Sequence, residues 1–164
     1  MALITSQTET IPDLNYEYHT ITIDSVDQSS ANAFTCYLPQ PLKNVVQARL
    51  IATQINSTAS TEHCYISISE LDTNFSDRAS NVQDGQGHLS ILRNSFASLI
   101  KDTDTTVVFK DNYPIVTQYI NPIRRIDRFT VVIRDQDGNP IVPSDPTPKN
   151  NFLIIRFVCR KPNL

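Results

Sequence analysis

Apolar and polar residues alternate with a period of two in several short runs, a pattern typical of β-strands with one buried face. The clearest run is Ile126–Arg134. One face of this run is apolar and consists of Phe129, Val131 and Ile133. The opposite face is polar and consists of Arg128, Thr130 and Arg134. A second run, Ile115–Ile120, precedes it across an Asn121-Pro122 corner, and the turn residues Asp137–Pro140 follow it. We therefore predict two strands here, with a defined end after the second.

The same alternation recurs elsewhere in the chain. It predicts further strands at His19–Asp24, Ala33–Leu38, Asn44–Asn56, Cys64–Ser69 and Thr105–Phe109. In the run Cys64–Ser69, the face formed by Cys64, Ile66 and Ile68 is expected to point inward. In a last run, Phe152–Cys159, one face holds Leu153, Ile155, Phe157 and Cys159, and the other face is also largely apolar, so this strand is expected to be central or covered on both sides. The count is about eight strands.

The run Asn44–Asn56 is the longest, and a helix competes with a strand for it because Ala, Gln, Arg and Leu favour helices. The sustained alternation favours a strand. The predicted apolar face is Val46, Ala48, Leu50 and Ala52, and the predicted polar face is Gln47, Arg49 and Thr53. The preceding strand is expected to end at Pro39-Gln40-Pro41, because proline has no N–H to donate to a neighbouring strand.

The remaining segments are mostly polar. Residues 1–18 form a predicted N-terminal arm, and residues 19–164 a single domain. Leu71–Gly87 and the Pro-containing Val142–Asn151 are predicted surface loops. His88–Lys101 fits either a helix or a strand, and the sequence leaves this open.

Strands without intervening helices, and no internal repeat, predict an all-β protein, an antiparallel β-sandwich. About eight strands in two sheets favour a single jelly roll. An immunoglobulin-like domain is disfavoured because the chain has no Trp and no cysteine pair of that class.

The composition and the net charge argue against several classes of function. Charged residues make up 19% of the chain and the net charge is -3, without a basic stripe, so we expect no nucleic-acid partner. Cys36, Cys64 and Cys159 lie in alternating runs and are predicted to be buried, reduced thiols of a chain that folds in a reducing compartment. No apolar run approaches the length of a membrane span, and Met1–Thr10 is too polar for a signal peptide.

Candidate catalytic chemistry is sparse. His19, His63 and His88 match no common metal-ligand spacing with the cysteines. Asp135-x-Asp137-Gly138 resembles the start of a calcium loop, but the later glutamate is missing, so a hairpin turn is favoured. No nucleophile-elbow motif occurs. We therefore predict a non-enzyme without a metal or cofactor.

The local basic cluster is Arg124, Arg125 and Arg128, which fits either a solvated strand edge or a subunit contact. Together with Tyr16 and Tyr18 of the arm, these arginines are the candidate subunit interface.

Four runs carry a resemblance that covers most of Asn44 to Cys159. In chain order they are NVVQARLIATQIN, CYISISEL, YPIVTQYINPIRRIDRFTVVIRDQDGNPI and NNFLIIRFVC, with PI-x-x-I-D-x-F-T-V-x-I-x-D-x-D-G as the most telling pattern. This order resembles the single jelly-roll penton proteins at the five-fold vertices of large icosahedral double-stranded DNA viruses. The resemblance implies a homopentamer in the virion capsid that contacts major and minor capsid proteins and assembles in the host cytoplasm.

A ring of identical subunits closes through two different, complementary edges of each subunit. The arm and the two loops are candidates for contacts with neighbours or with the shell. Two other classes stay open. One is a minor capsid or fibre sandwich that binds a receptor or glycan through tyrosines such as Tyr16, Tyr18 and Tyr37. The other is an enzyme on the same sandwich.

Overall fold

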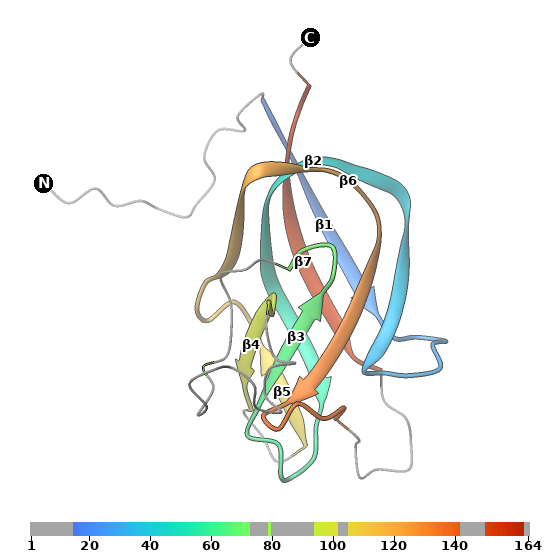
Figure 1. Cartoon of the computed structure of the whole chain (residues 1–164), viewed down its shortest axis with the longest axis vertical. Coiled ribbons are helices and arrows are strands. Elements are labelled where there is room, and N and C mark those ends of the chain that lie inside the picture. Colours follow the sequence, from blue (N-terminus) through green and yellow to red (C-terminus); the bar gives the residue numbers. More distant parts are fainter. Residues whose placement is uncertain (1–14, 73–78, 80–93, 102–104, 142–149, 163–164) are drawn as a thin grey trace, which may run out of the picture.

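The computed structural model describes residues 15–72, 79, 94–101, 105–141 and 150–162. Their regular structure consists of strands alone: β1 (Tyr16–Asp24), β2 (Ala33–Asn56), β3 (His63–Ile68), β4 (Ala97–Ile100), β5 (Thr106–Phe109), β6 (Ile115–Asp135) and β7 (Phe152–Arg160). They form one sheet in the order β1-β7-β2-β6-β3-β4, and β5 pairs with β2. Every pairing is antiparallel. Figure 1 shows this sheet curled into a half-barrel.

The prediction of an all-β, antiparallel protein is confirmed. The prediction of two separate sheets is not confirmed, because the strands form one curled sheet. β2 and β6 are long enough to run through both halves of this sheet. They have 24 and 21 residues, and they pair with each other from Ala33 opposite Val132 to Leu50 opposite Ile115. This bent ribbon is the frame on which the other strands are placed.

The prediction that Pro39-Gln40-Pro41 ends a strand is wrong, since β2 continues through both prolines. The register shifts between Tyr37 and Leu42, so the prolines lie in a bulge opposite Asp127 of β6. A second shift, between Val45 and Gln47, lies opposite the Asn121-Pro122 corner, which is a bend within β6. Bulges leave residues unpaired and bend strands, so the missing proline N–H groups cost no ladder bonds here. Both strands bend at the upper end in Figure 1.

The buried face of β2 differs from the predicted one. Ala48 and Leu50 are buried as expected, whereas Val46 and Ala52 are only half-buried. The other buried positions in this half of the strand include Val45, Thr53 and Ile55. The pairing of β2 with β7 shifts between Val45 and Gln47 and again between Leu50 and Ala52. Each bulge inserts a residue and reverses the phase of the alternation, which a strict period of two does not anticipate.

The predicted core faces of β3, β6 and β7 are confirmed. Three strands contribute buried triplets at alternate positions: Cys64, Ile66 and Ile68 of β3, Phe129, Val131 and Ile133 of β6, and Leu153, Ile155 and Phe157 of β7. The rings of Phe129 and Phe157 stack with centroids 5.3 Å apart, although β2 separates β6 from β7 in the sheet. The curl therefore folds the sheet over a shared interior. As predicted, β7 is central, and its outer residues Phe152, Ile154 and Val158 are half-buried.

A buried amide ties the strand ends together away from the bend. The side chain of Asn151 is 1% exposed. Its Oδ1 accepts hydrogen bonds from the backbone N (2.8 Å) and Nδ2 (3.0 Å) of Asn56. Its Nδ2 donates to the carbonyl oxygen of Ala31 (2.9 Å) and to Oδ1 of Asn32 (3.2 Å). All positions of this amide are satisfied, so it fixes the ends of β2 and β7 and the β1–β2 connection.

Several local predictions need adjustment. Tyr16–Tyr18 begin β1 rather than ending an arm, and residues 1–14 lie outside the described part. Leu71 is fully buried, while most of Leu71–Gly87 and residues 142–149 of the proline-containing loop lie outside the described residues. The described end of His88–Lys101 contains strand β4 and no helix.

The predicted hairpin turn after β6 is confirmed. The carboxylate of Asp135 accepts hydrogen bonds from the backbone N of Asp137 and of Asn139. Gly138 adopts a φ of 81°, which glycine reaches without steric cost. The Asp135 carboxylate therefore serves the backbone of its own turn.

All three cysteines are free; Cys64 and Cys159 are buried as predicted, whereas the prediction is wrong for Cys36, which is only half-buried. Burial raises the pKa of the Cys64 thiol to about 12. The reactive thiolate is therefore a smaller fraction of Cys64 in the native protein than in the unfolded chain. We expect Cys64 to resist a thiol-reactive probe in the native protein and to react fully in denaturant, as read by mass spectrometry of labelled peptides. Rapid labelling of Cys64 in the native state would contradict its placement in the core.

Candidate functional site

The five predicted interface residues lie on two surfaces. Tyr16 and Tyr18 are on β1 and line a shallow groove of about 430 Å³ across the outer face of the sheet. Its other lining residues come from three strands: Val46, Gln47, Gln118, Tyr119, Ile120 and Val158. The register explains the groove, because Val158 lies opposite both Tyr18 and Gln47, and Gln47 lies opposite Gln118. Tyr18 is 52% exposed and Ile120 93% exposed.

The arginines lie on β6, at and just after its bend. Arg125 Nε donates to both carboxylate oxygens of Asp127, each at 2.9 Å. This hydrogen bond lowers the pKa of Asp127 and raises that of Arg125, and both side chains are exposed. Because such exposed pairs contribute little to stability, Arg125 remains available to a partner's carboxylate.

The other two arginines differ in their pairing. Arg128 Nε lies 3.9 Å from Oε1 of Glu70. Glu70 is itself held by Thr130, whose backbone N (2.7 Å) and Oγ1 (3.0 Å) donate to its carboxylate. Arg124 is exposed and makes no ion pair within the described residues. Arg124 is thus the arginine of this cluster with the most freedom to bind elsewhere.

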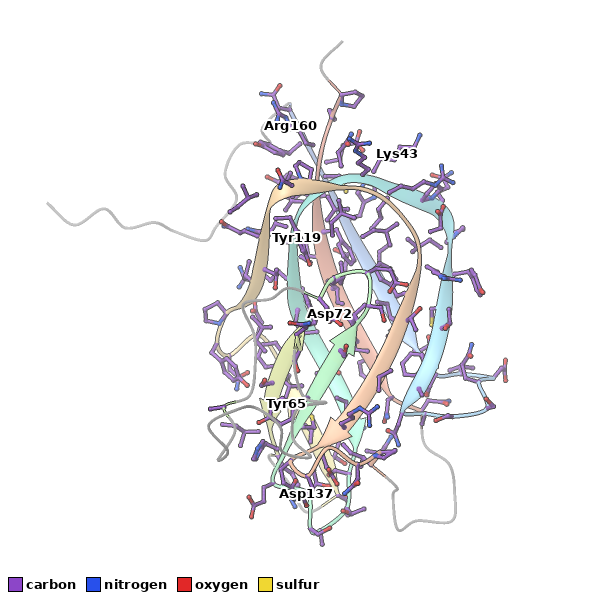
Figure 2. All side chains as sticks on the ribbon, viewed as in Figure 1. Lys43, Tyr65, Asp72, Tyr119, Asp137 and Arg160 are labelled. Carbon is purple, nitrogen blue, oxygen red and sulfur yellow. The ribbon has the colours of Figure 1, made fainter. Side chains whose placement is uncertain are left out.

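The fold adds basic residues that the sequence did not connect to the cluster. Lys43 lies opposite Arg125 in the β2–β6 register. Arg160, at the end of β7, follows Cys159, which lies opposite Val45. Figure 2 shows Lys43 and Arg160 at the same end of the molecule, beside the bend. Strand pairing between residues more than 80 positions apart creates this basic end, so sequence spacing alone carries no signal for it.

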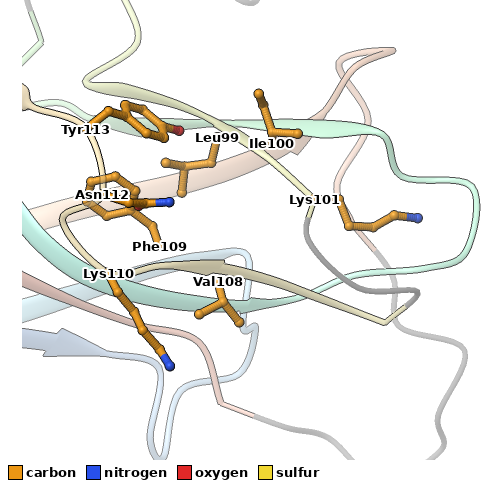
Figure 3. A pocket seen from close by; sticks show the side chains of 8 residues that line it. All are labelled: Leu99, Ile100, Lys101, Val108, Phe109, Lys110, Asn112 and Tyr113. Atoms are coloured by element: carbon orange, nitrogen blue, oxygen red, sulfur yellow. The ribbon is translucent and has the colours of Figure 1, made fainter.

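A second hollow, which sequence reasoning missed, lies between β4 and β5. It measures about 440 Å³ and is shown in Figure 3. Among the described strands β4 pairs only with β3 and β5 only with β2, so both present an unpaired edge to the hollow. The buried Leu99 and Phe109 contribute to its lining, as do Ile100 and Tyr113, which are 73% and 40% exposed.

Two lysines also line this hollow, and they differ in what they bind. Lys101 Nζ donates to the carbonyl oxygens of Ala59 (2.8 Å) and Thr58 (3.3 Å). Lys110 is exposed at the end of β5. The hollow is therefore lined by both apolar side chains and lysines. Lysines are common at exposed strand edges, whereas an exposed apolar side chain such as Ile100 at such an edge favours a contact surface.

The buried ionisable groups beneath these surfaces make structural bonds. The Tyr119 hydroxyl donates to the carbonyl oxygen of Leu71 (2.8 Å), and burial raises its pKa. The Asp72 carboxylate accepts from Ser67 Oγ (2.6 Å) and from the backbone N of Ile68 (2.9 Å). Burial also raises the pKa of Asp72. Figure 2 labels both residues; together their bonds link β6 to the turn after β3.

In the described part of the chain no three His, Cys, Asp or Glu side chains gather as a metal site requires, and His88 lies outside that part. The same residues include no helix with the length and apolar character needed to cross a membrane. A scan against protein-family models finds no match, and a search of curated proteins finds no relative.

Proposed function

We propose that this chain is a structural capsid protein, the penton subunit that forms homopentamers at the five-fold vertices of a large icosahedral double-stranded DNA virus. The observation that carries the proposal is the order in which the strands pair. The runs that resemble penton proteins in sequence supply β2, β3, β6 and β7, the strands that form the centre of that order.

The pairing order supports a jelly roll when β2 and β6 are each divided at their bend. One layer is then β1, β7, the second half of β2 and the first half of β6, extended by β5. The other is the first half of β2, the second half of β6, β3 and β4. Two four-stranded layers joined by shared, bent strands are the arrangement of a jelly roll, a frequent architecture of viral capsid proteins. The stacked pair of Phe129 and Phe157 joins the two layers.

The proposed mechanism is physical and requires no catalytic group. A homopentamer with closed symmetry has one heterologous interface repeated around the ring. The half-barrel offers dissimilar surfaces for this: the tyrosine groove, the basic end around Arg124 and the hollow between β4 and β5. Surfaces that the ring leaves free would contact the major and minor capsid proteins.

The three free cysteines fit assembly in the reducing host cytoplasm. On this account the mature location is the virion capsid.

The proposal is tested by electron microscopy of the purified chain at high concentration. Negatively stained particles should give class averages with five-fold symmetry. Averages with three-fold symmetry, or elongated particles with two-fold symmetry, would rule out the vertex role.

A second candidate function rests on the tyrosine groove. An exposed Tyr18 beside Ile120 suits the apolar face of a sugar ring, as in a minor capsid or fibre module that binds a receptor or glycan. Tyr37, 74% exposed, lies on the first half of β2 and does not line this groove. A glycan array compares the wild-type chain with Tyr18→Ala. A hit that the substitution removes supports this function, and an array without hits rejects it.

A further inference from the structure

We infer that the turn between β1 and β2 of one copy packs into the hollow between β4 and β5 of the next copy. This inference rests on the proposed function, because a closed ring needs two different surfaces on each subunit that fit each other. It goes further by naming both surfaces.

The hollow has the features of a receiving surface. Its lining combines buried Leu99 and Phe109 with the exposed side chain of Ile100. The Tyr113 ring meets the Phe109 ring edge-on, with centroids 5.0 Å apart, and so holds one side of the hollow in place. An isoleucine that is 73% exposed beside two unpaired strand edges loses apolar exposure when a partner covers it.

The β1–β2 turn has the features of an inserting surface. Val26 is 49% exposed at the turn, and its backbone N donates to the Asp24 carboxylate (3.0 Å). Gln28 N donates to the carbonyl oxygen of Ser25 (3.1 Å), which closes the turn. Ser25 is 2% exposed and is bonded to Asn151. The turn is thus fixed from below before any partner arrives, which lowers the entropic cost of binding.

The charges of the two surfaces are complementary. Asp27 follows Val26 and is exposed, with a φ of 58° that turns the chain at this point. On the hollow, the Lys101 ammonium already binds two backbone carbonyls, whereas Lys110 is exposed and makes no ion pair within the described residues. When Val26 covers Ile100, Asp27 can pair with Lys110. Complementary charges of this kind orient a contact and disfavour the wrong register.

The positions of the two surfaces suit a ring. Figure 1 shows the β1–β2 turn on one flank of the half-barrel and β4 and β5 on the opposite flank, at a similar height. A contact between opposite flanks is a head-to-tail, heterologous contact, the type from which a ring of identical subunits is built.

Charge reversal tests the contact. Asp27→Lys and Lys110→Asp should each weaken self-association at least about tenfold in sedimentation velocity, because each places like charges together. The double variant, which restores an opposite pair at every interface, should recover most of the wild-type assembly. Asp137→Lys is the matched control, since Asp137 is exposed outside the two surfaces, and it should assemble like the wild type.

Cross-linking tests the geometry. In a Cys36→Ser background, Val26→Cys and Ile100→Cys variants are treated with a short bismaleimide. Each variant alone should give no cross-linked dimer, a mixture should give one, and the chain with both substitutions should give a ladder that ends at the ring size. The contact is wrong if the wild-type chain forms a ring, the charge variants assemble normally and the mixture gives no cross-link. These results would leave the penton proposal standing. A wild-type chain that stays monomeric at every concentration would overturn both.

Discussion

Replacing Phe129 with alanine will lower the free energy of unfolding by about 3–5 kcal/mol. Phe129 is fully buried and stacks on Phe157 with ring centroids 5.3 Å apart. The substitution removes the ring that joins the two halves of the curled sheet, and the bent β2–β6 ribbon restricts the collapse that would refill the cavity. Because domains of this size have about 5–15 kcal/mol of stability, this is a large share of the total.

The measurement is urea unfolding followed by circular dichroism and by tyrosine fluorescence, since the chain has six Tyr and no Trp. Tyr37→Ala is the matched control. Tyr37 pairs with Arg128 one position along the same ladder and is 74% exposed, so its loss should change stability by less than about 1 kcal/mol. Equal effects of the two substitutions would show that Phe129 is not part of a shared core.

The second large effect is expected for Asn151→Ala, which should cost about 3 kcal/mol. The substitution leaves two donors of Asn56 and the acceptors on Ala31 and Asn32 without their partner in a buried setting. Each buried polar group left unsatisfied costs about 1–3 kcal/mol, partly relieved where water enters. Since the Asn151 side chain also binds Ala31 and Asn32 of the β1–β2 connection, this variant should lose assembly along with stability.

Two further variants show whether the loss of stability comes from the buried position of the Asn151 amide. Asn112→Ala removes an exposed asparagine and should leave the unfolding midpoint unchanged. Asn151→Asp keeps the acceptor oxygen but buries a carboxyl, which favours the protonated form. Its native state therefore binds the proton more tightly than the unfolded chain, so its stability should be highest at low pH and fall as pH rises. A pH-independent loss would argue against a buried site.

The strands themselves were predictable because each buried face carries its own alternation. The triplets of β3, β6 and β7 match the predicted faces residue by residue. What the sequence could not predict is how strands continue through irregularities. A proline within a strand lacks the N–H group for a ladder hydrogen bond. In β2 the prolines lie in a bulge, where no such bond is formed, and the partner strand that defines this bulge is some 90 residues away.

The same limit explains the error in the buried face of β2. Val46 and Ala52 keep a strict period of two, and nothing local marks the two bulges that move Val45, Thr53 and Ile55 inward. The pairing order is also non-local, because β7 lies between β1 and β2 in the sheet although it follows them by about a hundred residues in the sequence. A prediction of jelly-roll order from sequence therefore depends on resemblance, whereas the strand faces follow from periodicity.

The candidate interface was only partly predictable. Tyr18 and Arg124 are exposed as a contact residue should be, but Arg125 and Arg128 already lie beside Asp127 and Glu70. The sequence pattern carries no signal for Lys43, Ile100 or Lys110, because their significance depends on how the strands pair. Whether an apolar side chain such as Ile100 is exposed depends on the fold. The period-two pattern gives the face on which a side chain lies, but it does not say whether another strand covers that face.

Native mass spectrometry of the full chain over a range of concentrations decides whether the chain forms the proposed ring. We expect a discrete species of five subunits that grows with concentration at the expense of monomer, without a series of open oligomers. A stable trimer as the end state would contradict the penton assignment and point to a fibre or minor capsid component.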